Sequence, residues 1–531
     1  MYFLRAVGIH GVIAIMSNVY TTKKLLTFTN FDHGINTTKS VDELDPTEFI
    51  TAVNIDLKAR GGYTQRKGCS VHKALLENNI PLAYPISKLI DYPGKPLLVI
   101  NKSLRDWDNN TITLLLNSNN ISYEFFTNSK LYIMDGTEYW VYDGTTLTAV
   151  TPGGSTDLTH IKKCTSMIQR GQRLFAIGDP DNPNYLYFSD IGDPTTFQAS
   201  SIVKAVTDDT DSLTGLITFA DCLLAFKKHS IFKWSGWDPT NDVEFKDMDT
   251  GHGAVNSDVI KVSDNYLIHA DDEGVFCLTT VETNVIKSYN ISKPIDDIYK
   301  TLTNKDKMKA VVYQGNYYLA CCNDGTGVNN LVLKASLGMA YNSSSDEGVD
   351  SLLFPWVEYT GWNVADWLVS GGELYFGSSK DGVIYKAFDG INDSTYLDGV
   401  LSEKAISVET YHYLKLEDPV VTKKLKSLFL IAQQSETNSC VLRMDIEANY
   451  LTYSKQVNLA ESGSWDTSDW DNVNWDWVDT VTKEIKLNRK SSRVKVKITH
   501  KVLNETMTIY GFAAYYKTKK PRGSRNGITN L

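Results

Sequence analysis

The chain has 531 residues and a formal net charge of −10, and 42% of its residues are hydrophobic and 22% charged. This length predicts two or three domains unless one domain is a large repeat architecture, and the composition excludes a disordered chain. The acidic balance argues against wholesale binding of nucleic acid, which needs basic surface to displace counterions, although it also serves simple solubility. DNA could still slide along an acidic wall without sticking to it.

The seven cysteines are spread along the chain, and neither their odd number nor their spacing suits a disulfide framework or a zinc site. The nine histidines show no metal-binding pattern either, so no metal and no cofactor is expected. A reducing compartment such as the bacterial cytosol is the simplest inference.

The first segment, residues 1–16, is expected to be an over-extended start, with Met16 as the true first residue. Its apolar stretch after Arg5 resembles a signal peptide only superficially, because no small-residue cleavage site follows. The stretch is too short to span a bilayer, and no other segment is apolar and long enough to cross a membrane.

Residues 17–84 are expected to form an N-terminal arm with some strands, since Asp, Asn and Gly there favour turns and tight bends. The segment is expected to contribute few core residues of its own. Strand signals dominate after it, where aromatic and β-branched residues lie in short alternating runs that are interrupted by turn residues.

A loose repeat predicts an irregular β-propeller of six or seven blades over residues 85–398. Each unit has a polar turn, an apolar strand, a second turn and an aromatic-rich strand, and a weaker first copy lies near 96–100. The other copies are separated by 43, 49, 44, 52 and 55 residues at Leu131, Leu174, Leu223, Leu267, Leu319 and Leu374. Propeller blades of four strands have a period of about 40–50 residues. Tandem sandwiches are the rival all-β interpretation.

One short helix is expected between blades, after Ser292. Ser292 can cap it, Pro294 suits its first turn, and Ile295, Ile298, Tyr299 and Leu302 follow at helical spacing.

The last part of the chain predicts a β-sandwich over residues 399–516 and a basic tail over 517–531. Six strands are expected, at 406–414, 424–433, 439–447, 483–488, 492–500 and 506–516. The tail carries the basic residues Lys517, Lys519, Lys520, Arg522 and Arg525 and is expected to be solvated or to dock on a neighbouring subunit.

The segment 464–479 combines tryptophans and carboxylates without any Lys or Arg. Its tryptophans, which we expect to make a subunit contact because Trp is enriched at interfaces, are Trp465, Trp470, Trp475 and Trp477. Ordinary packing, sugar binding by Trp and carboxylate, and calcium binding remain open alternatives. This acidic segment and the basic tail are candidates to pair between neighbouring subunits.

The N-terminal part carries a set of motifs that resembles the start of tail nozzle or hub proteins of tailed bacteriophages, also called tail stabilisation or tail tubular proteins. The motifs are Asn30-Phe31-Asp32-His33-Gly34-Ile35-Asn36, Asp45-Pro46-Thr47-Glu48-Phe49, Asn54-Ile55-Asp56-Leu57, Gly61-Gly62-Tyr63 and Arg66-Lys67-Gly68. A strand followed by Ser189-Asp190 and then Asp193-Pro194-Thr195-Thr196-Phe197 is also similar to these proteins, as are 356–377 and 511–517. The resemblance covers most of the chain from about residue 27.

The resemblance implies a structural virion protein that assembles into a ring lining or closing the genome-delivery channel. It implies self-association, an adaptor above, fibres or tip proteins alongside, and passage of phage DNA without specific binding. It also implies synthesis in the host cytoplasm and a final place in the virion tail.

Enzyme chemistry is not expected. No nucleophile-elbow motif and no phosphate-binding glycine loop occurs, and any pair of carboxylates chosen for glycoside hydrolysis would be arbitrary. A receptor-binding or glycan-degrading tail protein is the main alternative function, and a secreted propeller lectin is a more distant one.

Overall fold

The protein was analysed as a computed structural model that describes residues 13–14, 23–77, 80–107, 112–153, 156–205, 211–234, 236, 245–248, 250–282, 285–344, 350–397, 400–417, 422–435, 440–460 and 480–518. The chain divides into two units: unit 1 comprises residues 1–66 and 405–531, and unit 2 comprises residues 67–404. Both units are built from β-strands, and the described residues contain one short α-helix. The expected all-β class is therefore confirmed.

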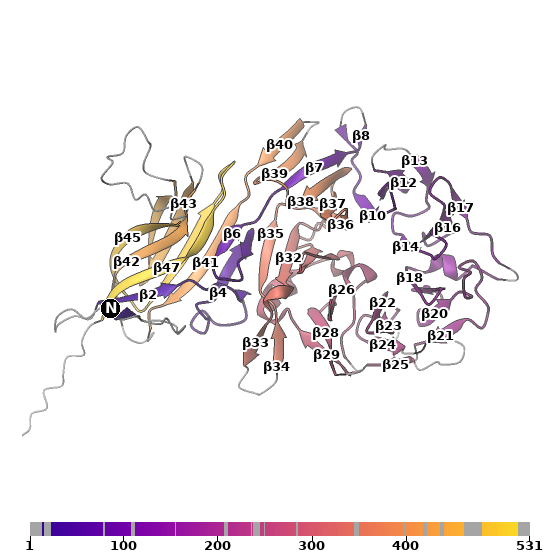
Figure 1. Ribbon diagram of the computed structural model, residues 1–531, viewed down its shortest axis with the longest axis horizontal. Helices are drawn as coiled ribbons and strands as arrows, with labels where there is room; N and C mark the ends of the chain where they lie inside the picture. Colours follow the sequence, from indigo (N-terminus) through magenta and orange to yellow (C-terminus); the bar gives the residue numbers. More distant parts are fainter. Residues whose placement is uncertain are drawn as a thin grey trace, which may run out of the picture. The chain divides into compact units, whose positions relative to one another are not determined.

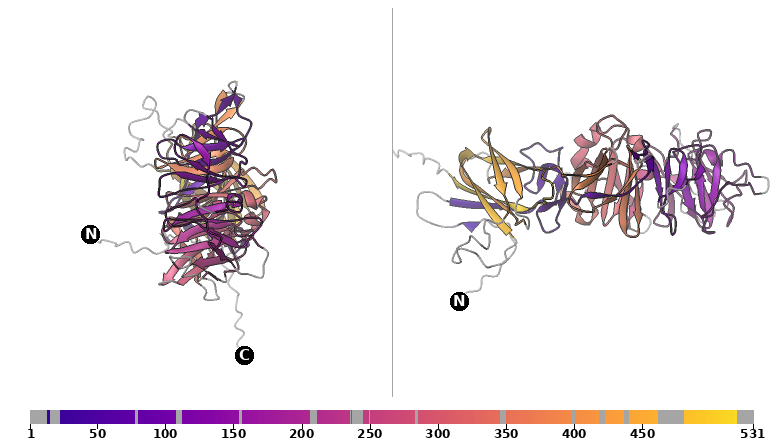
Figure 2. Two further views of the ribbon diagram at one scale, coloured as in Figure 1. Left: turned by 90° about the vertical axis from the view of Figure 1, so that its right-hand side faces the viewer. Right: turned by 90° about the horizontal axis from the view of Figure 1, so that it is seen from above.

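Unit 2 is a β-propeller, and its described residues form seven blades of four antiparallel strands each (Figure 1). Figure 2 shows the same blades from two further directions. The strands of blades 1 to 4 are β10 (Ile86–Ile90), β11 (Leu97–Ile100), β12 (Ser103–Asp106) and β13 (Ile112–Leu115); β14 (Ser122–Phe125), β15 (Leu131–Met134), β16 (Tyr139–Tyr142) and β17 (Leu147–Ala149); β18 (Ser166–Arg170), β19 (Arg173–Ile177), β20 (Tyr185–Phe188) and β21 (Ile202–Lys204); and β22 (Gly215–Phe219), β23 (Cys222–Phe226), β24 (Ile231–Trp234) and β25 (Phe245–Asp247).

Blades 5 to 7 continue in chain order, and the last one takes its outer strand from the start of the unit. Their strands are β26 (Lys261–Ser263), β27 (Tyr266–Ala270), β28 (Val275–Glu282) and β29 (Val285–Asn290); β30 (Lys309–Tyr313), β31 (Asn316–Cys321), β32 (Leu331–Ser336) and β35 (Trp356–Thr360); and β36 (Val364–Ser370), β37 (Glu373–Ser378), β38 (Val383–Ala387) and β7 (Cys69–Ala74). Three hairpin additions lie outside this plan, and they are β8 (Leu76–Glu77) with β9 (Ile80–Pro81), β33 (Tyr341–Ser344) with β34 (Asp350–Leu353), and β39 (Asp393–Leu397) with β40 (Val400–Lys404).

Strand β7 closes the ring, because it pairs antiparallel with β38 and so completes blade 7 from the other end of the unit. The first strand of blade 1, β10, contacts the first strand of blade 7, β36. Buried apolar side chains join these blades, including Leu98 and Ile100 of blade 1 and Leu368 and Ile384 of blade 7. The sequence-based boundary at residue 85 missed this closing strand.

The repeat that predicted the propeller corresponds to the second strand of each blade. Leu131, Leu174, Leu223, Leu267, Leu319 and Leu374 lie in β15, β19, β23, β27, β31 and β37, and all of them are fully buried. The weak first copy is β11, whose four side chains are also buried. These leucines are buried because each blade covers its neighbour, as in the cluster that joins blades 1 and 2.

The predicted helix is present as a 3-10 turn at Lys293–Ile295 followed by α1 (Asp296–Thr301), with Pro294 in the first turn. Ser292 does not cap it. The Ser292 hydroxyl instead accepts a hydrogen bond from Val275 N at 2.9 Å and lies 3.0 Å from Asn290 Oδ1.

Unit 1 is a β-sandwich made from both ends of the chain. One sheet has the order β1 (Ile13–Ala14), β2 (Lys23–Phe28), β47 (Thr508–Thr518), β42 (Lys423–Gln433) and β45 (Thr480–Ser491), with β5 (Ile55–Leu57) and β6 (Tyr63–Gln65) attached to β47. The other contains β3 (Gly34–Ile35), β4 (Glu48–Val53), β41 (Val408–Lys415), β46 (Arg493–His500), β43 (Val441–Ala448) and β44 (Leu451–Asn458). Between them the His412 ring lies 5.1 Å from Phe512 and 4.6 Å from Phe49.

The segment expected as an arm is folded into unit 1 as strands β2 to β6 and supplies core residues. Phe31, Phe49 and Tyr63 are completely buried. Residues 67–84 instead belong to unit 2. The sequence boundaries differ from these units because β2 pairs with β47 across almost the whole chain, and such long-range pairing leaves no local pattern.

The C-terminal strands agree with the predicted ones except for β44, which was not expected. Seven of its eight side chains are exposed, so no apolar alternation marks it. Strand β47 also extends to Thr518, two residues beyond the expected end of the sandwich. In the described part of the chain, the helix is far too short and polar to cross a membrane.

Candidate functional site

The predicted subunit-contact residues are only partly within the described structure. The tryptophans Trp465, Trp470, Trp475 and Trp477 and the basic residues Lys519, Lys520, Arg522 and Arg525 lie outside the described residues. Lys517 is described, and it lies near the end of β47 and not in a free tail.

Strand pairing places Lys517 in a row of four lysines. Lys517 lies opposite Lys23 of β2 on one side and opposite Lys424 of β42 on the other, and Lys424 lies opposite Lys490 of β45. We call Lys23, Lys517, Lys424 and Lys490 the lysine row. Residues directly opposite each other share one face of a sheet, so all four ammonium groups belong to the same face. The strands that carry the row lie side by side in Figure 1.

The lysine row is exposed and carries charges of one sign. Lys23, Lys424 and Lys490 are exposed and Lys517 is half-buried, and within the described residues none of the four makes an ion pair. Partial burial and the neighbouring cations Lys424 and Lys517 lower the pKa of Lys426. Like charges directly opposite each other destabilise a sheet, so the row has a cost for the isolated unit.

The other sheet of unit 1 pairs its cations with carboxylates. Lys497 of β46 lies 2.7 Å from Glu409 of β41, and Lys495 lies 3.7 Å from Glu447 of β43. We call these two pairs the matched ladder. It shows that lysines on this sandwich have carboxylate partners in one sheet and lack them in the row.

A second group of charges lies at the axis of the propeller. Lys88, Lys261, Lys309 and Asp366 belong to β10, β26, β30 and β36, the innermost strands of blades 1, 5, 6 and 7. Asp258 precedes β26 in a 3-10 turn that Asn256 caps, because Asn256 Oδ1 accepts from Asp258 N at 2.8 Å. We call these five residues the axial cluster.

Ion pairs join the acidic and basic side chains of the axial cluster. Asp258 lies 2.5 Å from Lys88 Nζ and also pairs with Lys309, while Lys88 Nζ is 4.0 Å from Asp366. Burial opposes the charged form of Lys88, but Asp258 and Asp366 hold its pKa above the ordinary value. Burial likewise opposes the charged form of Asp258, but Lys88 and Lys309 hold its pKa well below the ordinary value. Burial lowers the pKa of Lys261. These contacts link blades 1, 5, 6 and 7 across the centre of the ring.

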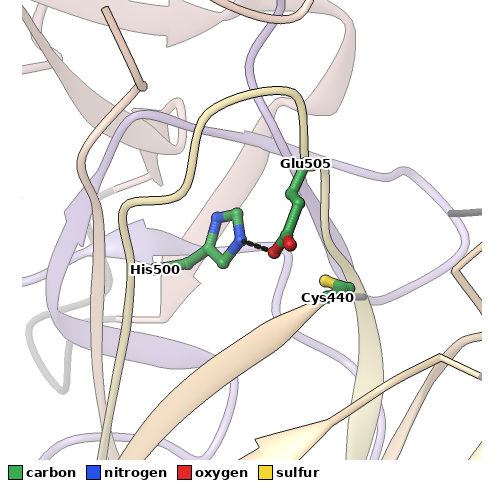
Figure 3. Close-up of side chains that lie close together, drawn as sticks. All are labelled: Cys440, His500 and Glu505. Carbon is green, nitrogen blue, oxygen red and sulfur yellow. Dashed lines mark hydrogen bonds and ion pairs between the residues drawn. The ribbon is translucent and has the colours of Figure 1, made fainter. Parts of the chain in front are cut away.

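A third polar group is buried in unit 1 (Figure 3). Cys440 immediately precedes β43, His500 ends β46, and Glu505 belongs to the loop 501–507 between β46 and β47. His500 Nε2 lies 3.2 Å from Glu505 Oε2, and one ligand atom from each residue lies within 4.8 Å of the others. Burial, together with the charge of Glu505, raises the pKa of the Cys440 thiol to about 12.

Another cluster of possible metal ligands lies in blade 3 and is already satisfied. Asp179 accepts from Asn182 Nδ2 at 2.9 Å and from Tyr187 OH at 2.8 Å, and the His160 ring lies 2.9 Å from it. Asp181 pairs with Lys163 at 2.5 Å. The carboxylates of this cluster therefore already have partners within the chain.

Every cysteine in the chain is a buried free thiol. Burial raises the pKa of Cys277 to about 12, and it also raises the pKa of Cys164 and Cys321. Only the thiolate form is a nucleophile, and a raised pKa disfavours that form in Cys164, Cys277 and Cys321.

The motifs that carry the family resemblance have structural roles. Arg66 is buried and donates from Nε to Asn54 Oδ1 at 2.8 Å. Gly68 closely approaches blade 7, and a Cβ there would lie 1.7 Å from the carbonyl oxygen of Asn392. Asn36 Nδ2 donates to the buried Glu48 at 2.8 Å. These side chains stabilise turns and the core, and they do not form an open site together.

Sequence signals for the three clusters were weak. Lys517 was identified from the basic tail, but Lys23, Lys424 and Lys490 lie in different strands and join it only through pairing. The His500 and Glu505 spacing matches no standard metal motif, and Cys440 is far from both in the sequence. The alternation of apolar and polar residues in the sequence of the innermost strands gave no reason to expect Lys88 close to Asp258.

No protein-family model matches the chain, and no curated protein matches it. Among solved structures, the chain is similar to a computationally designed protein at 9% identity, covering 68% of this chain and 97% of that chain with a TM-score of 0.34. It is similar to a WD40 domain from Neurospora crassa at 10% identity, covering 61% and 95% with a TM-score of 0.34. It is also similar to an exo-β-1,3-galactanase from Phanerochaete chrysosporium at 11% identity, covering 79% and 100% with a TM-score of 0.24. These low values carry no argument about function.

Proposed function

We propose that this chain is a structural protein of a bacteriophage tail that assembles into a nozzle or hub ring around the genome-delivery channel. The observation that carries the proposal is the lysine row, an exposed set of opposed like charges that an anionic partner from outside the sheet would stabilise. The resemblance of residues 30–68 to tail proteins supplies the class of assembly.

The axial cluster supports a role of the propeller as part of the wall around a channel. Ion pairs between blades occupy the centre of the propeller, where many propellers leave a channel. In the proposed assembly the genome therefore passes between subunits of a ring and not through one propeller. A ring forms when a head-to-tail interface closes by rotation.

The chain itself offers an anionic partner for the lysine row. Residues 464–479 contain five aspartates and four tryptophans without any Lys or Arg. We propose that this segment of one subunit contacts the lysine row of the next. Charge complementarity would fix the register, and tryptophan would supply the apolar contact area.

The test is the mass of the purified full-length chain in solution, measured by sedimentation velocity at low and moderate salt. We expect the parent to self-associate, and Lys424→Glu with Lys517→Glu to weaken self-association by more than about tenfold, because opposed like charges at an interface cost several kcal/mol. The matched control is Lys495→Glu with Lys497→Glu, which makes the same charge change on the matched ladder and leaves the mass of the assembly unchanged. Equal self-association of both double variants would contradict the proposed contact.

A receptor-binding or glycan-degrading tail protein is the second candidate, and the combination of Trp and Asp in residues 464–479 favours it. It predicts that the purified chain binds or cleaves host glycan and that Trp470→Ala with Trp475→Ala abolishes this. Glycan binding that survives the double substitution would count against a sugar site in this segment.

A further inference from the structure

The buried polar group of unit 1 brings together three side chains that can bind a metal ion. Cys440 is fully buried, and His500 and Glu505 are 2% and 6% exposed. Carboxylates are almost never fully buried unless they are paired, and Glu505 Oε2 accepts from Val441 N at 3.2 Å and lies 3.2 Å from His500 Nε2. Glu505 is the buried acidic side chain of a loop whose other residues from Lys501 to Asn504 are exposed.

Gln65 fixes the orientation of the His500 ring. Its Nε2 donates to the main-chain oxygen of Glu505 at 3.3 Å, so its Oε1 faces His500 Nδ1 at 3.2 Å. An amide oxygen only accepts hydrogen bonds, and the facing Nδ1 must therefore carry a hydrogen. In a neutral imidazole, the lone pair of Nε2 then points toward the carboxylate oxygen Glu505 Oε2.

When His500 is neutral, its Nε2 lone pair and Glu505 Oε2 face each other at 3.2 Å, with a thiol nearby. Either a proton or a metal cation must lie between them. Two ligand atoms at about 2.0–2.1 Å from zinc lie roughly 3.3 Å apart in a tetrahedral arrangement. The observed separation of Nε2 and Oε2 agrees with that value, and Cys440 Sγ lies within 4.8 Å of one ligand atom of each of the other two residues.

We propose that Cys440, His500 and Glu505 bind a divalent metal of the zinc class, which fixes the loop 501–507 to the start of β43. This inference does not depend on the proposed tail function. Thiolate, imidazole and carboxylate together suit zinc, and hard cations such as Mg²⁺ prefer all-oxygen sites. On binding, the Cys440 thiol loses its proton to solvent and the sulfur forms the metal bond.

Gln65 is a positioning residue in this proposal. Metal-binding histidines usually donate their other ring N–H to a carbonyl or carboxylate oxygen, as His500 Nδ1 does to Gln65 Oε1. The carbonyl oxygen of Thr506, 3.3 Å from Cys440 Sγ, or a water molecule can fill the fourth position. Because all three side chains are buried, the site would stabilise the loop and would not turn over a substrate.

The experiment titrates Co²⁺ into full-length protein that has been stripped with a chelator and kept reduced. We expect one equivalent to bind with a thiolate-to-cobalt charge-transfer band and the visible bands of a tetrahedral site, and Zn²⁺ to displace it. Cys440→Ser should abolish the charge-transfer band. Cys277→Ser is the matched control, because it removes another buried thiol, from blade 5, and should leave the band unchanged.

Two further variants distinguish loss of the metal ligands from misfolding of the Cys440 variant. Glu505→Gln keeps the size of the side chain and should weaken Co²⁺ binding at least tenfold, and Zn²⁺ should raise the melting temperature of the parent but not of this variant. Gln65→Leu keeps all three ligands and should weaken binding by about 10–100-fold. A folded parent that binds no Co²⁺, or a band that persists in Cys440→Ser, overturns the proposal.

Discussion

The axial cluster of unit 2 and the lysine row of unit 1 both collect lysines from neighbouring strands, but they treat the charge in opposite ways. At the propeller axis, Lys88 and Lys309 share Asp258, and Lys88 also lies 4.0 Å from Asp366, so these lysines have carboxylate partners within the unit. In the lysine row, Lys517 faces Lys23 and Lys424, and the described residues provide no carboxylate.

This difference separates two uses of charge. Paired charges that are removed from water hold elements together, and removing one partner leaves the others uncompensated. Exposed like charges directly opposite each other destabilise their own sheet, and an anion that covers them removes this cost. The axial cluster therefore belongs to the fold, and we propose that the lysine row serves assembly.

The largest expected effect comes from breaking the axial cluster. Asp258→Asn leaves Lys88 and Lys309 without their shared carboxylate, and we expect a loss of about 3–5 kcal/mol in the free energy of unfolding. Urea unfolding monitored by tryptophan fluorescence measures it. Asp272→Asn, on an exposed turn of the same unit, is the control and should change stability by less than about 0.5 kcal/mol.

The stability of both units is expected to depend on pH, because each unit buries a histidine away from any strong anionic partner. Burial lowers the pKa of His412 in unit 1 to about 3 and the pKa of His269 in unit 2 to about 4. Between those values and the unfolded pKa of about 6.5, the unfolded chain binds a proton that the folded chain does not. Stability therefore falls as the pH falls through this window, by about 1.4 kcal/mol per pH unit for each histidine.

His412→Phe tests this pH dependence for unit 1. Phenylalanine suits the surrounding aromatic core, and Tyr63 OH keeps Thr410 Oγ1 as a partner at 3.0 Å. We expect the unfolding of unit 1 to lose the part of the slope that His412 contributes between pH 6 and pH 4, while His269 keeps the slope of unit 2. An unchanged slope in this variant would mean that His412 is not buried in its neutral form.

The smallest expected effect has the opposite sign. Replacing Lys424 and Lys490 with Gln removes like charges from the lysine row and should raise the free energy of unfolding by about 0.2–1 kcal/mol at low salt. The same change at Lys495 and Lys497 removes ion pairs and should not raise it. Added salt should erase the gain, because the row is exposed and its charges are screened. A destabilised row variant would contradict the assignment of the row to assembly.

Much of unit 2 could be predicted from the sequence, because each blade folds from consecutive strands. The buried leucine of the second strand repeats from Leu131 to Leu374 and indicates the blades directly. The closing strand β7 could not be predicted in the same way. Its partner β38 lies about three hundred residues away, and only the folded ring brings the two together.

Unit 1 was harder to predict, for the same physical reason. Its core depends on contacts such as Phe31 with His412, which join the two ends of the chain. Strand β44 was missed because its exposed side chains give no alternation. Of the lysine row only Lys517 was identified from the sequence, and the Cys440, His500 and Glu505 group was not identified at all.

The central claim is that this chain forms part of the wall of a tail channel. The most direct measurement is electron microscopy of phage tails labelled with an antibody against this chain. The proposal predicts label on the tail axis, in a ring, in intact particles. Label confined to peripheral fibres, or its absence from purified virions, would contradict it.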